Sequence, residues 1–344
     1  MRFSLVAGVI AMLLSSALPA AETTIYYLQT DGRGGGTMWK VSSSGSIEHF
    51  EPALDADWNS GYFDDPHLVS PDGRRLVYRK NGDLWIHDLA TSEDRQATTV
   101  AKPYDGHFSA LGAQFVAWSP HGDRFLYEVT DPAHFPPAGC ADEPPPAVRR
   151  EFAYGYYVYD LHDRSTHFTK LPGRIMLWLS DEEVVVSSGT PVRWTPPYFR
   201  MGLGGDNPRL LPFPSNLDCG QPAADATGSR LLVDCTSGIK TSEIVELDLG
   251  DGSICSVSEV GEFAEFQWPS YSPSGREVAW VQELRTGGIW TETRILVDSK
   301  PVFGCEQLAV SFRWIDDDTI LAICRHGLTV LDLRTGDVKG QALY

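Results

Sequence analysis

The chain has 344 residues, of which 42% are hydrophobic, enough to bury a core and too many for a disordered protein. Its 46 acidic residues outnumber the 28 basic ones and give a net charge of −18, which argues against nucleic acids and anionic membranes as partners. With 32 glycines, 23 prolines and 11% aromatic residues, the composition favours many short strands joined by turns.

Residues 1–20 are predicted to be a cleaved secretory signal peptide. Arg2 precedes an apolar stretch from Phe3 to Leu14, and small residues with a proline follow it. The stretch is too short for a transmembrane helix, and no other uninterrupted apolar run approaches 18 residues. A buried N-terminal strand or helix is the alternative. We therefore expect an exported protein, periplasmic or secreted, in which residues 21–344 form a single domain without a membrane span.

Residues 52–65 are the first of three long, unusual segments, and they lie in an acidic region. Over residues 41–73 there are seven carboxylates and no Lys or Arg. Asp55, Asp57 and Asn59 alternate as oxygen ligands do at the start of a calcium loop, but its sixth and twelfth positions lack the required Gly and Glu. A solvated acidic turn is the alternative. The three residues are thus weak candidates for binding Ca²⁺ or another divalent cation, and we expect no resident cofactor.

A recurring turn motif is the strongest indication of the fold. The first residues of successive copies are 49, 61, 45, 47 and 44 positions apart, and an insertion explains the long step. Proline presets the second turn position, and glycine accepts the left-handed conformation that closes a hairpin. The clear copies are Ser70–Gly73, Ser119–Gly122 and Ser272–Gly275, and weaker ones begin at Ser180, Asp225 and Asp316.

The repeat predicts a β-propeller. A second periodic mark, Asp-Leu at the end of an apolar strand, occurs at Asp88, Asp160, Asp248 and Asp332. Each unit then contains four antiparallel strands, which is one propeller blade. Six units begin near His67, Ala113, Ile175, Cys219, Phe266 and Leu308, and residues 24–50 supply three earlier strands.

We therefore predict an all-β propeller of seven four-stranded blades. The first blade either lacks its innermost strand or is closed with a strand from the C-terminus, and six blades are the alternative. No window sustains a 3.6-residue apolar period, which excludes a helical or doubly wound fold.

The three long segments are expected on one face of the ring. Connections between blades share a face with the loops that join second to third strands; we call it the connection face, and it holds residues 52–65, 100–112 and 131–150. The proline-containing turns lie on the opposite face, the turn face. Loops on a rigid scaffold commonly carry function, so the connection face is the predicted binding surface, with neutral insertions as the alternative. Its candidate residues are Asp55, Asp57, Trp58, Asn59, Tyr62, Asp64, His67, Tyr104, His107 and Phe135.

Histidines and aromatic residues are further candidates for function. Four histidines map to the connection face, but no His-x-His pair accompanies them, so scattered polar residues are the simpler interpretation than a metal site. They are His67, His107, His134 and His326. Aromatic side chains of the long segments, if exposed, are anchors for a partner. Five tryptophans in strand positions are instead predicted to pack between blades: Trp118, Trp178, Trp268, Trp280 and Trp314.

All six cysteines lie beyond the predicted signal peptide, which fits an oxidising compartment. Two pairs share one pattern, in which a cysteine opens a strand and a second one closes the returning strand: Cys219 with Cys235, and Cys305 with Cys324. Cys140 and Cys255 are left over, and their pairing stays open. Metal ligation is the alternative, although the sequence contains no C-x-x-C.

Residues 64–99 resemble the WD-like propeller repeat of the TolB type, and AWSPHGDRFLYEV and PSYSPSGREVAWV are further copies. The resemblance is strongest at 64–130 and 266–344, and it implies a propeller that serves as a platform. Nothing in the sequence corresponds to the α/β domain that precedes the TolB propeller. The repeats are also similar to the non-catalytic half of prolyl-oligopeptidase-type peptidases, but G-x-S-x-G of the hydrolase half is missing.

These motifs assemble no nucleophile, general base or metal set. The leading prediction is therefore a non-enzymatic exported propeller that binds a protein or peptide, most simply a periplasmic or envelope protein, over its acidic connection face. Two alternatives remain: a metal-assisted lyase or hydrolase of a sugar or peptide, and a glycan or small-ligand binding module.

Overall fold

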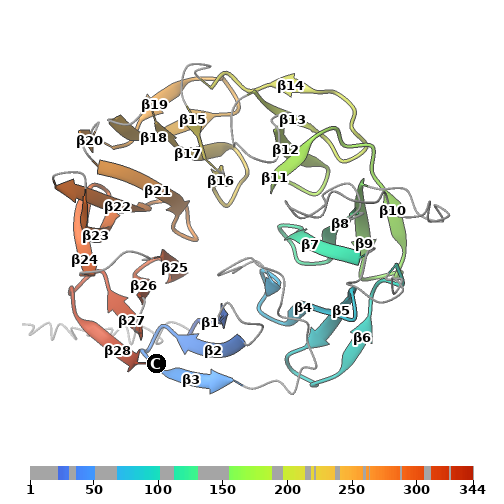
Figure 1. The fold of residues 1–344 in the computed structure, drawn as a ribbon, viewed down its shortest axis with the longest axis horizontal. Coiled ribbons are helices and arrows are strands. Elements are labelled where there is room, and N and C mark those ends of the chain that lie inside the picture. Colours follow the sequence, from blue (N-terminus) through green and yellow to red (C-terminus); the bar gives the residue numbers. More distant parts are fainter. Residues whose placement is uncertain are drawn as a thin grey trace, which may run out of the picture.

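The computed structural model is a ring of seven antiparallel sheets that follow one another in chain order (Figure 1). Each sheet is one blade, so the predicted seven-bladed propeller is confirmed and the six-bladed alternative is wrong. No helix among the described residues is long and apolar enough to cross a membrane. The structure describes residues 22–30, 36–50, 68–100, 112–130, 155–187, 197–213, 218–220, 222–236, 241–258, 261–262, 264–286, 289–305, 311–324 and 327–343.

The strands are numbered in chain order, and each blade runs from its inner to its outer edge. Blade 1 has β1 (Thr24–Thr30), β2 (Gly36–Ser42) and β3 (Ile47–Phe50); blade 2 has β4 (Arg75–Lys80), β5 (Asp83–Asp88) and β6 (Asp94–Gln96). Blade 3 has β7 (Gly112–Trp118), β8 (Arg124–Thr130), β9 (Gly155–Asp160) and β10 (Thr166–Phe168); blade 4 has β11 (Arg174–Trp178), β12 (Glu183–Ser187), β13 (Tyr198–Gly202) and β14 (Arg209–Leu210).

Blade 5 is built on two long strands, β17 (Arg230–Thr236) and β18 (Thr241–Asp248), with broken strands on either side. The inner pieces are β15 (Asp218–Cys219) and β16 (Ala223–Ala224), and the outer pieces are β19 (Ile254–Ser256) and β20 (Gly261–Glu262). Blade 6 has β21 (Ala264–Tyr271), β22 (Val278–Thr286), β23 (Ile289–Val297) and β24 (Lys300–Cys305); blade 7 has β25 (Ser311–Asp316), β26 (Thr319–Cys324), β27 (Gly327–Asp332) and β28 (Val338–Leu343).

The core lies between the blades because both faces of each sheet are covered by its neighbours. In β17, Leu231 and Val233 pack against blade 4, whereas Leu232 between them packs against Phe266 and Trp280 of blade 6. Side chains of a strand alternate between its two faces, so a sheet buried on both faces needs continuous apolar runs. This explains why these central strands read as unbroken apolar sequence.

The turn motifs form as predicted. Gly73, Gly122 and Gly275 adopt left-handed φ angles of 68°, 70° and 72°, which a side chain would strain. Asp88 ends β5 of blade 2 and accepts hydrogen bonds from the backbone N–H groups of Ala90 and Thr91, each at 3.0 Å. Asp160, Asp248 and Asp332 end the third strands of blades 3, 5 and 7 and accept the equivalent bonds.

Among the described strands the ring closes without an exchanged strand, so of the two predicted forms of blade 1 the incomplete one is found and the closure with a C-terminal strand is not. β28 pairs with β27 in blade 7, and β1–β3 form their own sheet. Blade 1 and blade 7 meet instead at Gly45, whose φ is 99° and where an added Cβ would lie 2.4 Å from the carbonyl oxygen of Lys339. The Lys339 ammonium donates to the carbonyl of Ser43 at 3.1 Å. Glycine is therefore required at the closure.

Among the described residues, blades 1 and 2 have three-stranded sheets. Blade 1 lacks the innermost strand, which is the other predicted alternative. In blade 2 the innermost strand is reduced to a single bridge between Val69 and Leu76.

Candidate functional site

The predicted binding residues lie outside the described residues. This holds for Asp55, Asp57, Trp58, Asn59, Tyr62, Asp64, His67, Tyr104, His107 and Phe135, and also for His134, His326 and Cys140. The strand ends that border these segments are described. Residues 51–67 connect blade 1 to blade 2, 101–111 connect blade 2 to blade 3, and 131–154 join β8 to β9. In antiparallel blades these borders all lie on the connection face, at three consecutive blades (Figure 1).

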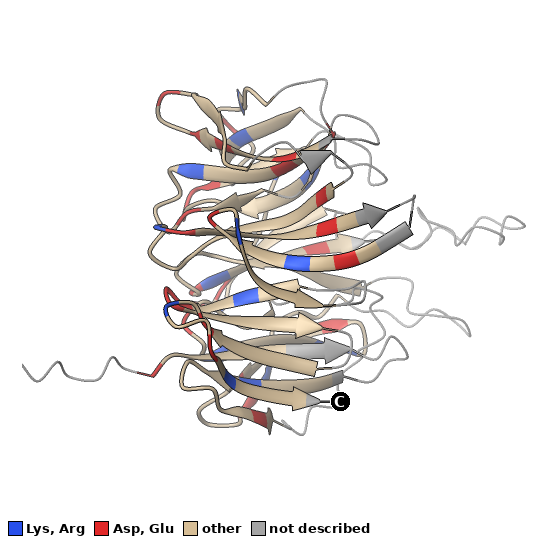
Figure 2. Cartoon of the chain, turned by 90° about the vertical axis from the view of Figure 1, so that its left-hand side faces the viewer, with Lys and Arg blue, Asp and Glu red and all other residues tan. Residues whose placement is uncertain are grey.

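Acidic residues of the opposite turn face are largely acceptors for the turns themselves. Figure 2 shows acidic residues at many of the turns on its left-hand side. Asp332 accepts hydrogen bonds from two backbone N–H groups and pairs with the Lys339 ammonium at 3.0 Å, and this bond to Lys339 lowers the pKa of the Asp332 carboxyl. Hydrogen bonds from Ser165 and Ser253 likewise lower the pKa of Asp163 and of Asp251. These carboxylates are part of the scaffold.

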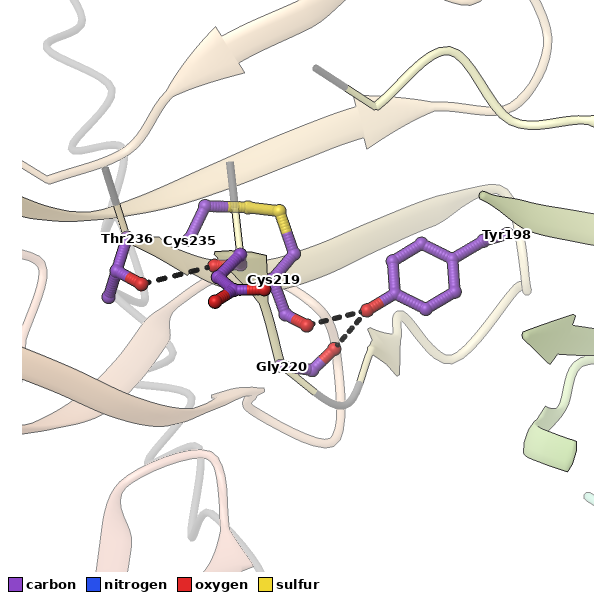
Figure 3. Close-up of a disulfide and its surroundings, with 6 residues drawn as sticks. Tyr198, Cys219, Gly220, Cys235 and Thr236 are labelled. Carbon is purple, nitrogen blue, oxygen red and sulfur yellow. Dashed lines mark hydrogen bonds between the residues drawn. A yellow bond between two sulfur atoms is a disulfide. The ribbon is translucent and has the colours of Figure 1, made fainter. Parts of the chain in front are cut away.

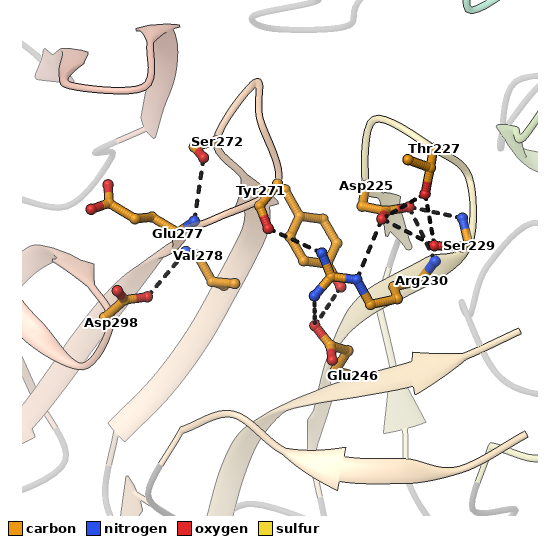
Figure 4. A network of polar contacts seen from close by, with 11 residues as sticks. Asp225, Thr227, Ser229, Arg230, Glu246, Tyr271, Ser272, Glu277, Val278 and Asp298 are labelled. Carbon is orange, nitrogen blue, oxygen red and sulfur yellow. Dashed lines mark hydrogen bonds and ion pairs between the residues drawn. The ribbon is translucent and has the colours of Figure 1, made fainter. Parts of the chain in front are cut away.

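Arginines of the turn face tie neighbouring blades together (Figure 4). Arg230, the first residue of β17, pairs with Asp225 and Glu246 of its own blade, each at 3.3 Å. The same guanidinium donates to the carbonyl of Gly275 in blade 6 at 3.0 Å and lies 5.0 Å from the ring centroid of Tyr271. The cation–π contact and the hydrogen bonds fix blade 5 to blade 6.

The same arrangement recurs between blades 3 and 4. Arg124, the first residue of β8, donates to the carbonyl of Asp181 at 2.9 Å and lies 5.7 Å from the ring centroid of Trp178. Between blades 6 and 7, Arg276 pairs with Asp317 at 3.0 Å. The turn face is therefore fastened by its own charged side chains at three blade junctions.

Blade 5 holds a buried polar site near the centre of the ring (Figure 3). Cys219 of β15 and Cys235 of β17 stand opposite each other and form the predicted disulfide. The Tyr198 hydroxyl donates to the carbonyls of Cys219 and Gly220, at 2.6 and 3.0 Å. Burial raises the pKa of Tyr198, and the nearby carboxylates of blade 5 raise it further.

Asp234 is an acid in an unfavourable environment for its charge. Burial raises the pKa of its carboxyl to about 7, and the charge of Glu265 on blade 6 adds to the shift. Its side chain keeps some contact with solvent, although protein surrounds it on nearly every side. An added Cβ at Gly220 would collide with the carboxylate of Asp234, so a larger residue there would force that carboxylate to shift.

The second disulfide confirms a predicted pair but not its predicted placement. Cys305 does not open a strand; it ends β24 of blade 6, and Cys324 ends β26 of blade 7. The bond therefore links two blades, whereas Cys219–Cys235 lies within one. Cys255 on β19 is an exposed free cysteine.

Four of the five strand tryptophans pack as predicted. Trp118, Trp178 and Trp280 are buried, and the indole N–H of Trp118 donates to the carbonyl of Leu68 on blade 2 at 3.0 Å. Trp314 is half-buried and packs against the core between blades 6 and 7. The prediction is wrong for Trp268, which is 52% exposed.

No site for a metal is assembled by the described residues: they contain no group of three or more His, Cys, Asp or Glu side chains arranged to hold one. The weak cation candidates Asp55, Asp57 and Asn59 lie outside those residues and stay a prediction.

The fold is similar to solved propellers at low sequence identity. An oligogalacturonate lyase from Vibrio parahaemolyticus is 13% identical, with 88% of each chain covered and a TM-score of 0.53. Dipeptidyl peptidase 4 from Porphyromonas gingivalis is 11% identical over 91% of this chain and 49% of its own, with a TM-score of 0.51. No protein-family model and no curated protein matches the sequence.

TolB proteins are among the similar structures, as the sequence resemblance predicted. TolB from Acinetobacter baumannii is 14% identical over 91% of this chain, with a TM-score of 0.47. This chain spans 62% of that TolB, less than two thirds of its length. The lyase and the peptidase differ in activity, so at these identities the similarity shows a shared scaffold and no single activity.

Proposed function

We propose that this chain is an exported, non-enzymatic propeller that serves as an interaction platform for a protein or peptide, most simply one of the cell envelope. The observation that carries the proposal is the position of the strand ends that border residues 51–67, 101–111 and 131–154. These strand ends lie on one face at three consecutive blades. Clustered loops on a rigid support are a common design for a binding surface.

The state of the turn face also favours the connection face as the partner surface. Arg124, Arg230 and Arg276 already contact the neighbouring blade there, and the turn carboxylates accept bonds from their own backbone. Groups that are paired within the molecule must lose those bonds before they bind a partner, which costs free energy. The turn face is therefore the less favourable place to dock.

Export is supported by the two disulfides. Cys219–Cys235 and Cys305–Cys324 are bonds that persist in oxidising compartments and are rare in the cytosol. Their presence is compatible with a periplasmic or extracellular protein.

The proposal is tested by crosslinking in cells followed by mass spectrometry. The protein is compared with a double variant of the connection face, Trp58→Ala with Tyr104→Ala, and with a turn-face control, His162→Ala. We expect one reproducible partner whose capture falls at least 10-fold in the double variant and is unchanged in the control. Capture that is equal in all three proteins, or no reproducible partner, would contradict the proposal.

A further inference from the structure

Blade 1 has an inner strand edge that no described strand covers. Its sheet has the order β1-β2-β3, whereas blades 3, 4, 6 and 7 each have a fourth strand at the inner position. These innermost strands are β7, β11, β21 and β25, which lie nearest the centre of the ring (Figure 1). Blade 5 has two short pieces there, and blade 2 has the bridge between Val69 and Leu76. Among the described residues, blade 1 is therefore the blade whose innermost position holds no strand.

Hydrogen bonds at the turns identify β1 as a second strand and not as an innermost one. In blades 2, 3, 4, 5 and 7, the residue after the third strand donates its N–H to the carbonyl of the residue before the second strand. In blade 7, for example, Leu333 donates to Asp318 at 2.8 Å. In blade 1 the equivalent bond joins Ser43, which follows β2, to Thr23, which precedes β1, at 2.9 Å. The inner edge of β1 is thus the edge that an innermost strand covers in the complete blades.

The register of β1 shows which of its backbone groups face the centre of the ring. In an antiparallel pair, residues that are hydrogen-bonded to the partner strand alternate with residues whose N–H and C=O point away from it. Thr23 is bonded to Ser43, and the register of β1 with β2 has no shift. Tyr26 and Leu28 therefore direct their N–H and C=O groups inwards, where no described strand pairs with them. Such an edge is a ready template for a further strand.

The neighbouring blades offer contacts to a strand in this position. On one side, Val69 of blade 2 packs in the same apolar cluster as Tyr26. On the other side is β25 of blade 7, where Phe312 and Trp314 pack towards blade 6. Because side chains alternate along a strand, Ser311 is on the face of β25 towards blade 1. Its hydroxyl is buried and has no hydrogen-bond partner among the described residues, an arrangement that costs free energy until a partner is supplied.

We propose that the inner edge of β1 binds an extended segment of a partner polypeptide, which adds to blade 1 as its fourth strand. Strand addition at an open edge is a common mode of peptide recognition, in which main-chain hydrogen bonds supply affinity. The repeat itself identifies this occupant, because equivalent edges of blades 3, 4, 6 and 7 are each covered by an antiparallel strand of five to eight residues. The inference rests on the proposed platform function and deepens it, because it names the form in which the partner binds.

The direction of the added strand connects it with the connection face. β7, β11, β21 and β25 each begin at the connection face and end at a turn of the turn face. A segment that pairs antiparallel with β1 runs the same way, so its N-terminal end lies at the connection face. The partner is therefore expected to contact the connection face and the inner edge of β1 together.

The first measurement asks whether the edge is open in the protein alone. Leu28→Pro removes an inward N–H, whereas Gln29→Pro removes an N–H that belongs to the ladder with β2. Each is compared with the alanine variant at the same position, which keeps the N–H. Leu28→Pro should melt close to Leu28→Ala, and Gln29→Pro at least about 5 °C below Gln29→Ala. Equal losses at the two positions would mean that the same chain already covers the edge, which overturns the inference.

Binding is measured by isothermal titration calorimetry with a blocked synthetic peptide that copies an innermost strand, residues 112–118 of β7. We expect saturable binding to the unmodified protein. Two versions of the peptide carry N-methyl groups on alternate residues, one version for each edge of the strand. Only the version that is methylated on the edge facing β1 should lose binding, because the other edge stays unpaired.

A matched control separates the inner edge of blade 1 from the outer edges of the ring. Leu211 donates its N–H to the carbonyl of Tyr198, so Leu210 of the outermost strand β14 points its own N–H outwards. Leu28→Pro should weaken peptide binding at least 10-fold, and Leu210→Pro should leave it unchanged.

Three results of the binding experiment would overturn the inference. They are no saturable binding of the peptide, equal binding of both methylated versions, and equal effects of Leu28→Pro and Leu210→Pro. Light scattering adds a fourth: a dimer that Leu28→Pro dissociates would show that a second copy of the chain covers the edge.

The platform and the added strand fail in different ways. If a cellular partner is captured through the connection face and Leu28→Pro captures it normally, the added strand fails and the platform stands. If the peptide pairs with β1 but no cellular partner depends on the connection face, the platform fails.

Discussion

Asp234→Asn should stabilise the protein, and more so at high pH. The pKa of this carboxyl is about 7 in the folded chain, against an ordinary 3.8. An acid with a raised folded pKa destabilises the fold as pH rises from its unfolded to its folded pKa, because only the unfolded state then releases the proton. Below pH 3.8 the carboxyl is protonated in both the folded and the unfolded state, and above about pH 7 the cost to the free energy of unfolding stays constant.

The magnitude follows from the two pKa values. At about 1.4 kcal/mol per pKa unit, the penalty is roughly 1.5 kcal/mol at pH 5 and about 4 kcal/mol at pH 8. The second figure is an upper limit, because Asp234 keeps some contact with solvent, which screens its charge. An asparagine of similar shape has no charge and so escapes the penalty.

The assay is calorimetric melting at pH 5 and pH 8. Asp234→Asn should raise the melting temperature at both, with the larger rise at pH 8. Asp337→Asn, at an exposed turn, is the control and should change little at either pH. A variant that is less stable than the unmodified protein at pH 8, or whose gain does not grow with pH, would refute the reasoning.

Three further substitutions test the junctions between blades. Arg230→Ala removes the contacts to Gly275 and Tyr271 and should lower the free energy of unfolding by about 2 kcal/mol in a melting experiment. Arg294 pairs with a residue of its own strand, so the control Arg294→Ala should cost under about 0.5 kcal/mol. Equal losses would contradict the role of Arg230. Cys305→Ser with Cys324→Ser should cost about 3 kcal/mol in urea unfolding, and Cys255→Ser nearly nothing; an unchanged midpoint in the first would count against the inter-blade bond. Gly45 and Gly73 both have positive φ, but only Gly45 faces the backbone of β28. Gly45→Ala should therefore lower the melting temperature more than Gly73→Ala. Equal effects would mean that the contact with β28 does not hold the ring closed.

The ring was predictable because its signals are local. A proline-containing turn, a left-handed glycine such as Gly122 and a capping aspartate such as Asp88 each depend on a few adjacent residues. Repeated at nearly constant spacing, they give the blade count and the assignment of the two faces. The pairing of Cys219 with Cys235 was predictable for the same reason, since one hairpin brings them together.

Features that depend on neighbouring blades were not predictable in the same way. Cys305 ends the outer strand β24 of blade 6. The sequence around it also suits the first strand of blade 7, because the turn motif at Asp316 is a weak copy that does not fix where that blade begins. Trp268 reads as a core residue, and only the bulge shows that it is exposed. The contact of Arg230 with blade 6 depends on how two separate repeats pack.

The candidate binding residues of the connection face came from the sequence, and the structure adds the position of the strand ends that border them. Those borders are predictable because antiparallel strands must alternate in direction. The positions of the side chains in the long segments are not predictable in this way, since no repeat pattern constrains them.

Site-specific photocrosslinking tests the docking of a partner most directly. A photoreactive phenylalanine analogue is placed at Tyr104 or Phe135 on the connection face, and at His162 or Thr227 on the turn face, and the protein is irradiated in its native compartment. Adducts of one defined mass from the first two positions only are the expected result. Adducts from the turn face, or none from either face, would contradict the account.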